Sequence, residues 1–550
     1  MNKILLCVSL LGTLWMACND ATTATTAEST GSTFTKNKNV SSRDYSITHV
    51  NSYNDLFIDS QSVENIMADK KMTDTLANRI RSFYNARNYQ FAWFSGDGLT
   101  EQALGFWNLY NRYLASNDDT TLNNKGLKKA MNKLVANDSL LPNPKNKTIL
   151  NTEVMLTAQF IQYTLTAYER GAVKRKEVEH FVPSIKQDAA KLADSLLNKK
   201  HKDDKYFEDV NATYGLLKDQ LATYYDLYKK GGWQQINVKS KPYKQGMKSP
   251  EIVSIKKRLQ LTGDMEEGDT SQLFSDSLQV GVKNFQRRHG LKPTGSVDKQ
   301  TLHELNVPVL QRIKQILINM DRARWQPQDQ DGNMIFVNIP AFTLHVMEGK
   351  NEAFKMDVVV GKEGHNTRIF TGNLSQVVFN PGWNVPESIV EKEILPEIEK
   401  DPAYLEKQDM EKIGETEDGI PEIRQKPGPK NALGKIKFIF PNSFDIYFHD
   451  TPAKSLFKNN KRAFSHGCIR LSKPVELAEY LLKDQPGWNK AKIQEAMSSE
   501  EEKFVKLKDP VPVLISYYTA WVDENGKLNF REDIYDHDLE LSKKMFTDNL

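Results

Sequence analysis

The chain has 550 residues, of which 26% are charged and 39% hydrophobic, and its formal net charge is +3. A chain of this length divides into several domains, because single hydrophobic cores stop growing beyond about 250–300 residues. The charge is nearly balanced and no basic cluster is interleaved with aromatic residues, so we do not expect a nucleic-acid partner.

The first residues are organised as a targeting segment. Residues 1–3 carry a positive charge, and residues 4–14 form an apolar stretch too short to span a bilayer as a mature helix. Residues 15–18 (Trp-Met-Ala-Cys) resemble a bacterial lipobox, which implies lipidation of Cys18; a cleaved signal peptide over residues 1–18 is the alternative. Either interpretation predicts an exported protein, and the lipobox predicts a periplasmic lipoprotein anchored to a membrane.

A polar segment over residues 19–49 follows, rich in Thr, Ser and Asn. It cannot bury enough apolar surface to offset the entropy of ordering, so we expect a flexible tether. Of the three cysteines, Cys7 belongs to the targeting segment and Cys18 to the lipobox, which leaves Cys468 without a disulfide partner. A free thiol in an oxidising compartment is a liability unless it is used.

Residues 50–235 have mainly helical periodicity and are expected to form a helical domain. Thr152 is predicted to cap one helix, which Gly171 ends, and a second helix stops at Gly231-Gly232. No catalytic constellation is visible in this region, and its aromatic residues are expected to form a core.

Residues 247–306 form a second helical unit. Its last part, residues 282–306, closely resembles the peptidoglycan-binding type 1 domain, a three-helix bundle, with turns at Gly290 and Thr294-Gly295 and a helix cap at Asp298. The resemblance implies either glycan binding or a spacer that positions another domain. An amphipathic linker helix is predicted within residues 310–333.

From residue 334 the pattern changes to short β-branched and aromatic runs separated by turns, which predicts an antiparallel β domain over residues 334–518. Residues 387–430 interrupt the strands with a Glu- and Lys-rich stretch containing Gly and Pro, interpreted as an inserted helical lid. Residues 519–550 are assigned to a C-terminal tail. The predicted fold class is therefore multidomain α+β.

The sequence FSHGCIRL at residues 464–471 contains Cys468, the cysteine outside the first eighteen residues. Upstream, residues 444–450 alternate so that Tyr447 and His449 share one face of a predicted strand. A strand that ends in a histidine, followed by a loop and a Gly-Cys pair, is typical of an imidazole-activated thiol. The alternatives are a small buried cysteine, or zinc bound by His449, His466 and Cys468, for which the sequence offers no fourth ligand.

The pattern of His449 followed by Ser465-x-Gly467-Cys468-x-Arg470 resembles the catalytic signature of YkuD-type L,D-transpeptidases. The strand order over residues 334–518 is similar to the catalytic fold of that family. Residues 83–94 (FYNARNYQFAWF) resemble the scaffold domain of its long form. The resemblance implies a peptidoglycan L,D-transpeptidase that forms 3→3 cross-links through a Cys468 thioester, with release of D-Ala from a tetrapeptide donor. It implies no cofactor and no metal, and it implies that a carbapenem acylates Cys468.

In this resemblance Cys468 is the nucleophile and His449 the general base and acid, oriented by a backbone carbonyl. Backbone N–H groups around Gly467 and Cys468 are expected to bind the oxyanion. Arg470 is expected either to grip a substrate carboxylate or to form an ion pair with a loop acid. The remaining motif and cleft residues are assigned to substrate binding, with simple packing as the alternative for the two aromatic ones: Ser465, Tyr447 and Trp383.

Two other functions stay open. The same acyl-enzyme serves an L,D-carboxypeptidase or an enzyme that attaches or releases a wall-linked protein. A non-catalytic wall-binding lipoprotein would use residues 247–306 alone, but the presence of both Cys468 and His449 argues against it. The expected partners are peptidoglycan stem peptides, a membrane reached through the lipid anchor, and proteins of cell-wall synthesis.

Overall fold

The computed structural model describes the chain from residue 39 to residue 547 with six internal gaps. The described ranges are 39–117, 121–136, 142–167, 175–198, 212–237, 242–326 and 332–547. The predicted signal peptide with Cys18, the tether as far as residue 38, and Gly171 lie outside these ranges. Within them, no helix combines the length and the apolar character needed to cross a membrane.

The N-terminal region is helical and surrounds an aromatic core that includes Trp93, Phe106 and Phe160. The fifth helix begins at residue 147, not at the predicted Thr152. Asn146 accepts hydrogen bonds from the first turn, whereas the Thr152 hydroxyl donates to Thr148 O within the helix. The elements are α1 (Ser60–Asp69), α2 (Asp74–Asn85), β1 (Phe94–Ser95), β2 (Gly98–Leu99), α3 (Glu101–Ser116), α4 (Lys125–Ala136), α5 (Lys147–Ala167) and α6 (Arg175–His180).

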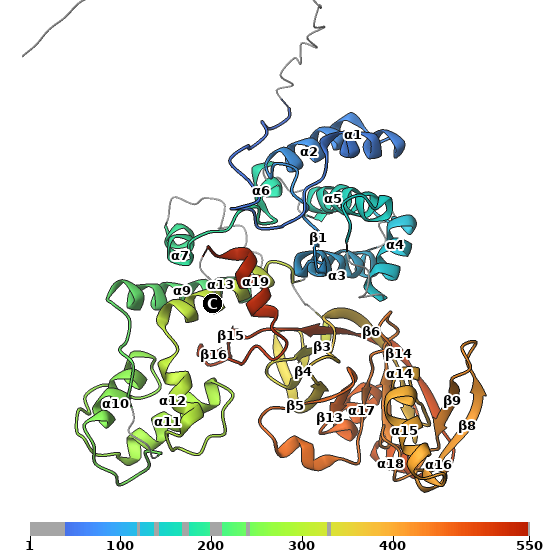
Figure 1. Ribbon diagram of the computed structural model, residues 1–550. Coiled ribbons are helices and arrows are strands. Elements are labelled where there is room, and N and C mark those ends of the chain that lie inside the picture. The colour runs from blue at the N-terminus through green and yellow to red at the C-terminus, as the bar shows by residue number, and fades with distance from the viewer. Residues whose placement is uncertain are drawn as a thin grey trace, which may run out of the picture. The chain divides into compact units, whose positions relative to one another are not determined.

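A second core forms around the linker helix, to which the C-terminal segment returns. Leu317 and Met320 of this helix pack with Leu221 and with Phe530 and Leu541 of the C-terminal segment. Figure 1 shows the hairpin and the last helix of that segment beside the linker helix. The elements of this core are α7 (Ala189–Leu197), α9 (Ala212–Lys229), α13 (Val309–Ala323), β15 (Ala520–Val522), β16 (Leu528–Phe530) and α19 (His537–Met545).

The predicted three-helix bundle is confirmed and consists of α10 (Glu251–Leu261), α11 (Asp276–Arg288) and α12 (Lys299–Asn306). Asp298 caps α12 by accepting a hydrogen bond from Thr301 N, as the sequence predicts. Gly290 and Gly295 have φ values of +67° and +73°, a backbone region that glycine adopts at little cost.

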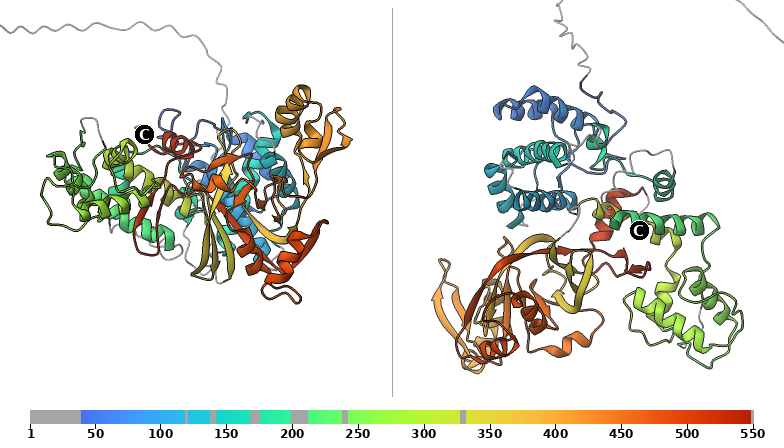
Figure 2. Two further views of the ribbon diagram at one scale, coloured as in Figure 1. Left: turned by 90° about the horizontal axis from the view of Figure 1, so that it is seen from below. Right: turned by 180° about the vertical axis from the view of Figure 1, so that it is seen from behind.

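The region from residue 332 onward contains a nine-stranded sheet among its described residues, in the order β12-β5-β13-β11-β10-β6-β14-β3-β4. Because β4 also pairs with β5, the sheet closes on itself and leaves few free edges. Figure 2 shows this curved sheet from two further sides. The strands are β3 (Asn333–Asn338), β4 (Thr343–Glu348), β5 (Asn351–Gly361), β6 (Phe370–Phe379), β10 (Ile436–Ile439), β11 (Phe448–His449), β12 (Ala463–Ser465), β13 (Ile469–Leu471) and β14 (Lys503–Ser516).

The prediction of an antiparallel β domain holds for most strand pairs but not for three, because β14 runs parallel to β3, β11 parallel to β13, and β12 parallel to β5. The strands of each parallel pair are separated by long connections, which a local alternation pattern does not reveal. Two helices, α17 (Pro474–Leu482) and α18 (Lys490–Ser498), bury Leu477 and Ile493 in the core of this domain.

The insertion at residues 387–430 is helical in its first part and forms a β-hairpin in its second. It has a small core of its own that includes Val390, Ile394 and Ile423. The hairpin extends β7 (Trp383–Asn384) into a three-stranded sheet of order β7-β9-β8. Its elements are α14 (Glu387–Ile389), a π-helical turn (Val390–Ile394), α15 (Leu395–Lys400), α16 (Tyr404–Lys407), β8 (Met410–Glu415) and β9 (Pro421–Gln425).

Candidate active site

The parallel pairing of β11 with β13 brings the two halves of the motif together. Phe448 lies opposite Ile469 and His449 opposite Arg470, and Ile469 N–H donates to Tyr447 O at 3.1 Å. Phe448 and Ile469 are fully buried in the core. Because side chains alternate along a strand, the residues before and after Phe448 and Ile469 share the opposite face. These residues are Tyr447, His449, Cys468 and Arg470.

The sulfur-bearing turn is held from within by Ser465. Gly467 has a φ of +113°, which favours glycine. Ser465 Oγ accepts from Gly467 N–H at 3.2 Å and donates to Cys468 O at 2.5 Å. Ser465 was expected to bind substrate and Gly467 N–H to bind the oxyanion, but both groups are occupied inside the turn. Cys468 N–H has no hydrogen-bond partner among the described residues.

The Cys468 thiol is partly exposed, and it donates to Asp445 O at 3.6 Å. Burial raises the pKa of the thiol, while hydrogen bonds from Tyr447 and the positive charge of Lys437 act in the opposite direction. No hydrogen bond joins the thiol to His449 within the described part of the chain. The resting cysteine is therefore a neutral thiol that points toward Asp445.

His449 is 4% exposed, and its ring orientation is fixed by its neighbour. Nδ1 lies 2.5 Å from Asp450 O, a contact that assigns the proton to Nδ1 and leaves Nε2 as the basic nitrogen. The Asp450 carboxylate faces elsewhere, because it pairs with Lys454 and accepts from Lys435 N–H. Burial, followed by the positive charge of Arg470, lowers the pKa of His449 to about 3, so the imidazole is neutral at physiological pH.

Two cations without an ion pair flank this histidine. Within the described residues neither Arg470 nor Lys437 has a carboxylate within salt-bridge distance, and Arg470 Nε is buried without a partner. The Lys437 ammonium lies 3.9 Å from the centre of the Tyr447 ring. Burial lowers the pKa of both cations. Asp445 and Glu502 act on Lys437 from a distance and oppose the effect of burial on its pKa, but neither cation forms an ion pair among the described residues. The alternative of an ion pair between Arg470 and a loop acid is therefore not seen there.

Lys437 was not singled out from the sequence, although a signal for it exists. It stands between the buried Ile436 and Phe438 on β10, and its register partner on β11 is His449. Alternation along this strand therefore places Lys437 on the face of the candidate site.

Two contacts reach the site from the insertion and from β7, which its hairpin extends. The Tyr447 hydroxyl interacts with Trp383 at the start of β7, and this contact opposes the effect of burial, which raises the pKa of Tyr447. His466 Nε2 lies 2.7 Å from Glu393 Oε1 of the π-helical turn. The His466 ring also lies 4.7 Å from that of His365. Glu393 and His365 were not expected at the site, because neither belongs to the motif.

The described residues contain no cluster of side chains that could bind a metal ion. Across the ranges that the structure describes, no three His, Cys, Asp or Glu side chains gather as metal ligands.

Comparison with known families matches three segments of the chain. Residues 332–513 match the L,D-transpeptidase catalytic domain (YkuD), residues 78–221 a scaffold domain, and residues 248–305 the family described as "Putative peptidoglycan binding domain". Residues 332–513 are a YkuD-type L,D-transpeptidase catalytic domain. The YkuD domain thus contains every predicted catalytic and substrate-binding residue.

Proteins that are similar to this chain are named as L,D-transpeptidases. A Haemophilus influenzae protein named "Putative L,D-transpeptidase" is 32% identical over 244 residues, which are 42% of this chain and 49% of that protein. The chain therefore covers about half the length of this curated relative. An L,D-transpeptidase from Mycobacterium smegmatis is 15% identical, with 34% of this chain and 58% of that chain covered and a TM-score of 0.19. An L,D-transpeptidase from Stackebrandtia nassauensis is 14% identical, with 50% and 97% covered and a TM-score of 0.22.

Proposed function

We propose that the chain is a peptidoglycan L,D-transpeptidase that forms 3→3 cross-links through a thioester on Cys468. The YkuD domain supports the reaction class. The observation that carries the proposal is the shared strand face of Cys468 and His449, with the histidine held by a backbone carbonyl and its Nε2 left basic.

Acylation begins when the thiol turns from Asp445 O toward His449. Nε2 accepts the thiol proton while the sulfur attacks the carbonyl of the third residue of a tetrapeptide stem. The oxyanion of the tetrahedral intermediate accepts a hydrogen bond from Cys468 N–H, which is otherwise unoccupied. The C–N bond then breaks, His449 returns a proton to the leaving amine, and D-Ala departs.

Deacylation uses the same groups in the opposite order. The side-chain amine of a neighbouring stem attacks the thioester, His449 takes a proton from that amine, and the C–S bond breaks with reprotonation of Cys468. Stem peptides carry carboxylates, and the unpaired charges of Arg470 and Lys437 supply positions to hold them. Tyr447 and Trp383 line the entrance on the side of the insertion.

The insertion acts as a lid in this proposal. Its Glu393 contacts His466 of the sulfur-bearing loop, so movement of the insertion changes access to Cys468. The bundle at residues 247–306 holds glycan strands near the cleft. The lipidated Cys18 and the tether anchor an exported enzyme to a membrane on the periplasmic side, within reach of proteins of cell-wall synthesis.

A defined tetrapeptide muropeptide tests the proposal. The purified mature protein is expected to release D-Ala and to yield a cross-linked dimer, as read by mass spectrometry, and the Cys468→Ala variant to yield neither. Free tripeptide product without dimer would instead support the carboxypeptidase. Absence of any turnover or acyl-enzyme would support a wall-binding protein and overturn the proposal.

A further inference from the structure

The carbonyl side of the Gly467–Cys468 peptide group has a partner outside the motif. Gly467 O accepts a hydrogen bond from Thr367 Oγ1 at 2.7 Å. Gly467 O and Cys468 N–H belong to the same peptide group, and this N–H has no hydrogen-bond partner among the described residues. Ser465 engages the two neighbouring peptide groups, at Gly467 N–H and Cys468 O.

Thr367 lies in the loop between β5 and β6, contacts the last residue of β5, and is 1% exposed. Its hydroxyl accepts from Gly361 N–H at 2.9 Å, so its single proton is free to be donated to Gly467 O. The chain is packed closely here: a Cβ added to Gly361 would lie 2.0 Å from His365 O and 2.8 Å from Thr367 N. The hydroxyl therefore has little room to rotate or shift.

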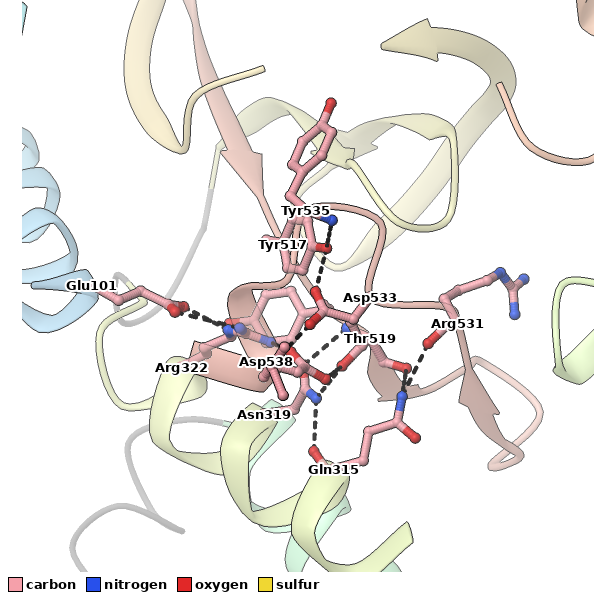
Figure 3. A network of polar contacts seen from close by, with 12 residues as sticks. Glu101, Gln315, Asn319, Arg322, Tyr517, Thr519, Arg531, Asp533, Tyr535 and Asp538 are labelled. Atoms are coloured by element: carbon pink, nitrogen blue, oxygen red, sulfur yellow. Dashed lines mark hydrogen bonds and ion pairs between the residues drawn. The ribbon is translucent and has the colours of Figure 1, made fainter. Parts of the chain in front are cut away.

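A tyrosine from the C-terminal segment holds this arrangement in place. Tyr535 is 7% exposed, donates to Gly361 O at 2.6 Å and accepts from Thr367 N–H at 3.3 Å. Its own N–H donates to the Tyr517 hydroxyl at 2.9 Å, and Tyr517 donates to Asp533 at 2.6 Å (Figure 3). Tyr535 lies 22 residues beyond the last residue of the YkuD match, which ends at 513.

We propose that Thr367 is a positioning residue for the oxyanion site and that Tyr535 holds it in place. A hydrogen bond accepted by Gly467 O fixes the plane of the Gly467–Cys468 peptide and polarises it, which makes Cys468 N–H a stronger donor. Fixed, polarised donors stabilise an oxyanion without the cost of reorganisation during the reaction. The inference rests on the proposed function, because it concerns the tetrahedral intermediate of that acyl transfer.

Two reagents separate this role from a structural one. With a carbapenem, the Cys468 sulfur attacks the lactam carbonyl, the C–N bond of the ring opens, and the nitrogen receives a proton, so the reaction passes through an oxyanion. With iodoacetamide, the sulfur displaces iodide from a CH₂ group and no oxyanion forms. A change in the oxyanion site therefore slows the first reaction and not the second.

The Thr367→Val variant removes the hydroxyl at nearly constant volume. We expect the carbapenem acylation rate, followed by intact mass, to fall about tenfold or more, since loss of a direct oxyanion donor costs about 100- to 1000-fold. The iodoacetamide rate is expected to stay within about twofold of the native rate, and Thr367→Ser to restore acylation. Equal losses with both reagents, or no loss with the carbapenem, would overturn the inference.

Tyr535→Phe and Tyr518→Phe form a matched pair. Both remove a buried hydroxyl from the same part of the chain, but the Tyr518 hydroxyl contacts Gln326 and not the loop at Thr367. Only Tyr535→Phe is expected to slow carbapenem acylation, by about three- to tenfold, while both variants keep the native circular dichroism spectrum. Equal acylation rates for the pair would remove Tyr535 from the inference. If the native protein forms no adduct with the carbapenem but reacts with iodoacetamide, the proposed function itself fails.

Discussion

Two arginines, each beside the core of this protein, differ in whether carboxylates pair with them. Arg322 of the linker helix is 7% exposed and is enclosed by two carboxylates: it donates to Glu101 at 2.5 Å and also to Asp538 (Figure 3). Arg470 of the YkuD domain has no carboxylate partner among the described residues, and its Nε is buried without a hydrogen bond.

The polar groups around the two side chains differ in the same way. Around Arg322 the polar groups are matched: Thr519 donates to Asp538, and Asn319 and Gln315 donate to Thr519. Around Arg470 they are not, because Lys437 is also unpaired and Cys468 N–H is open. Burying an unpaired charge is costly unless a partner arrives. The polar groups around Arg322 are paired within the chain, whereas Arg470 and Lys437 form no ion pair among the described residues.

The largest effect is expected from His449→Ala, which disables the cleft and leaves the junction intact. Loss of a general base lowers the acylation rate by about 100- to 10,000-fold. The unfolding free energy should change little, because the contact with Asp450 is local. Stopped-flow or mass-resolved acylation by a carbapenem measures the rate, and a native rate would remove His449 from the mechanism.

Arg322→Met removes the arginine that is paired with carboxylates. It leaves the buried Asp538 and the partly exposed Glu101 without this counterion, and breaking a buried pair costs about 3–5 kcal/mol of unfolding free energy. Urea denaturation measures this loss. The acylation rate per folded molecule is expected to stay within a few-fold of the native value, and an unchanged urea midpoint would contradict the structural role.

Arg470→Met sharpens the comparison because the same substitution is made in the cleft. Here no carboxylate loses its partner, so we expect no loss of stability in the same urea experiment. A lost hydrogen bond to a charged group costs about 1.5–3 kcal/mol, so kcat/KM for the muropeptide should fall about 10- to 150-fold. A large drop in stability with unchanged kinetics would reverse the two roles.

A smaller effect is expected from a third buried charge, Glu153 of α5. It accepts from Ala92 N–H, Trp93 N–H and the Tyr84 hydroxyl, and burial raises its pKa from 4.5 to about 7. The folded state then holds a proton that the unfolded state has released, so stability falls as pH rises from about 4.5 to about 7. The slope for one proton is at most about 1.4 kcal/mol per pH unit.

Thermal unfolding at several pH values measures this slope. The Glu153→Gln variant carries no titrating proton at this position and keeps an oxygen acceptor, so its melting temperature should fall less than the native one between pH 5 and pH 8. Identical profiles for the two proteins would show that Glu153 does not titrate in this range.

Local sequence signals predicted much of this molecule. The strand that ends at His449 was readable from alternation, the spacing of His449 and Cys468 from the motif, and Asp298 as a helix cap. The family match and the fold class are confirmed. The catalytic roles stay predictions, with Ser465 and Gly467 N–H now engaged within the turn.

Long-range contacts were beyond the reach of these signals. Tyr535 contacts Gly361 across 174 residues, and nothing near residue 535 indicates a role in the cleft. The parallel pairing of β14 with β3 likewise joins the two ends of a domain. The cap of α5 was misassigned because Thr152 and Asn146 are both residue types that cap helices, and residue preference alone does not decide which of them begins the helix.

The hydrogen bonds of Tyr535 mean that the YkuD module does not end where its family resemblance ends. A fragment truncated at residue 518 would retain Cys468 and His449 but lose Tyr535 and its hydrogen bonds to Gly361 and Thr367. Gene fusions that transplant this module need to carry the final thirty residues along. Compounds selected against the shortened fragment would bind a site whose loop at Thr367 is held less firmly than in the whole protein.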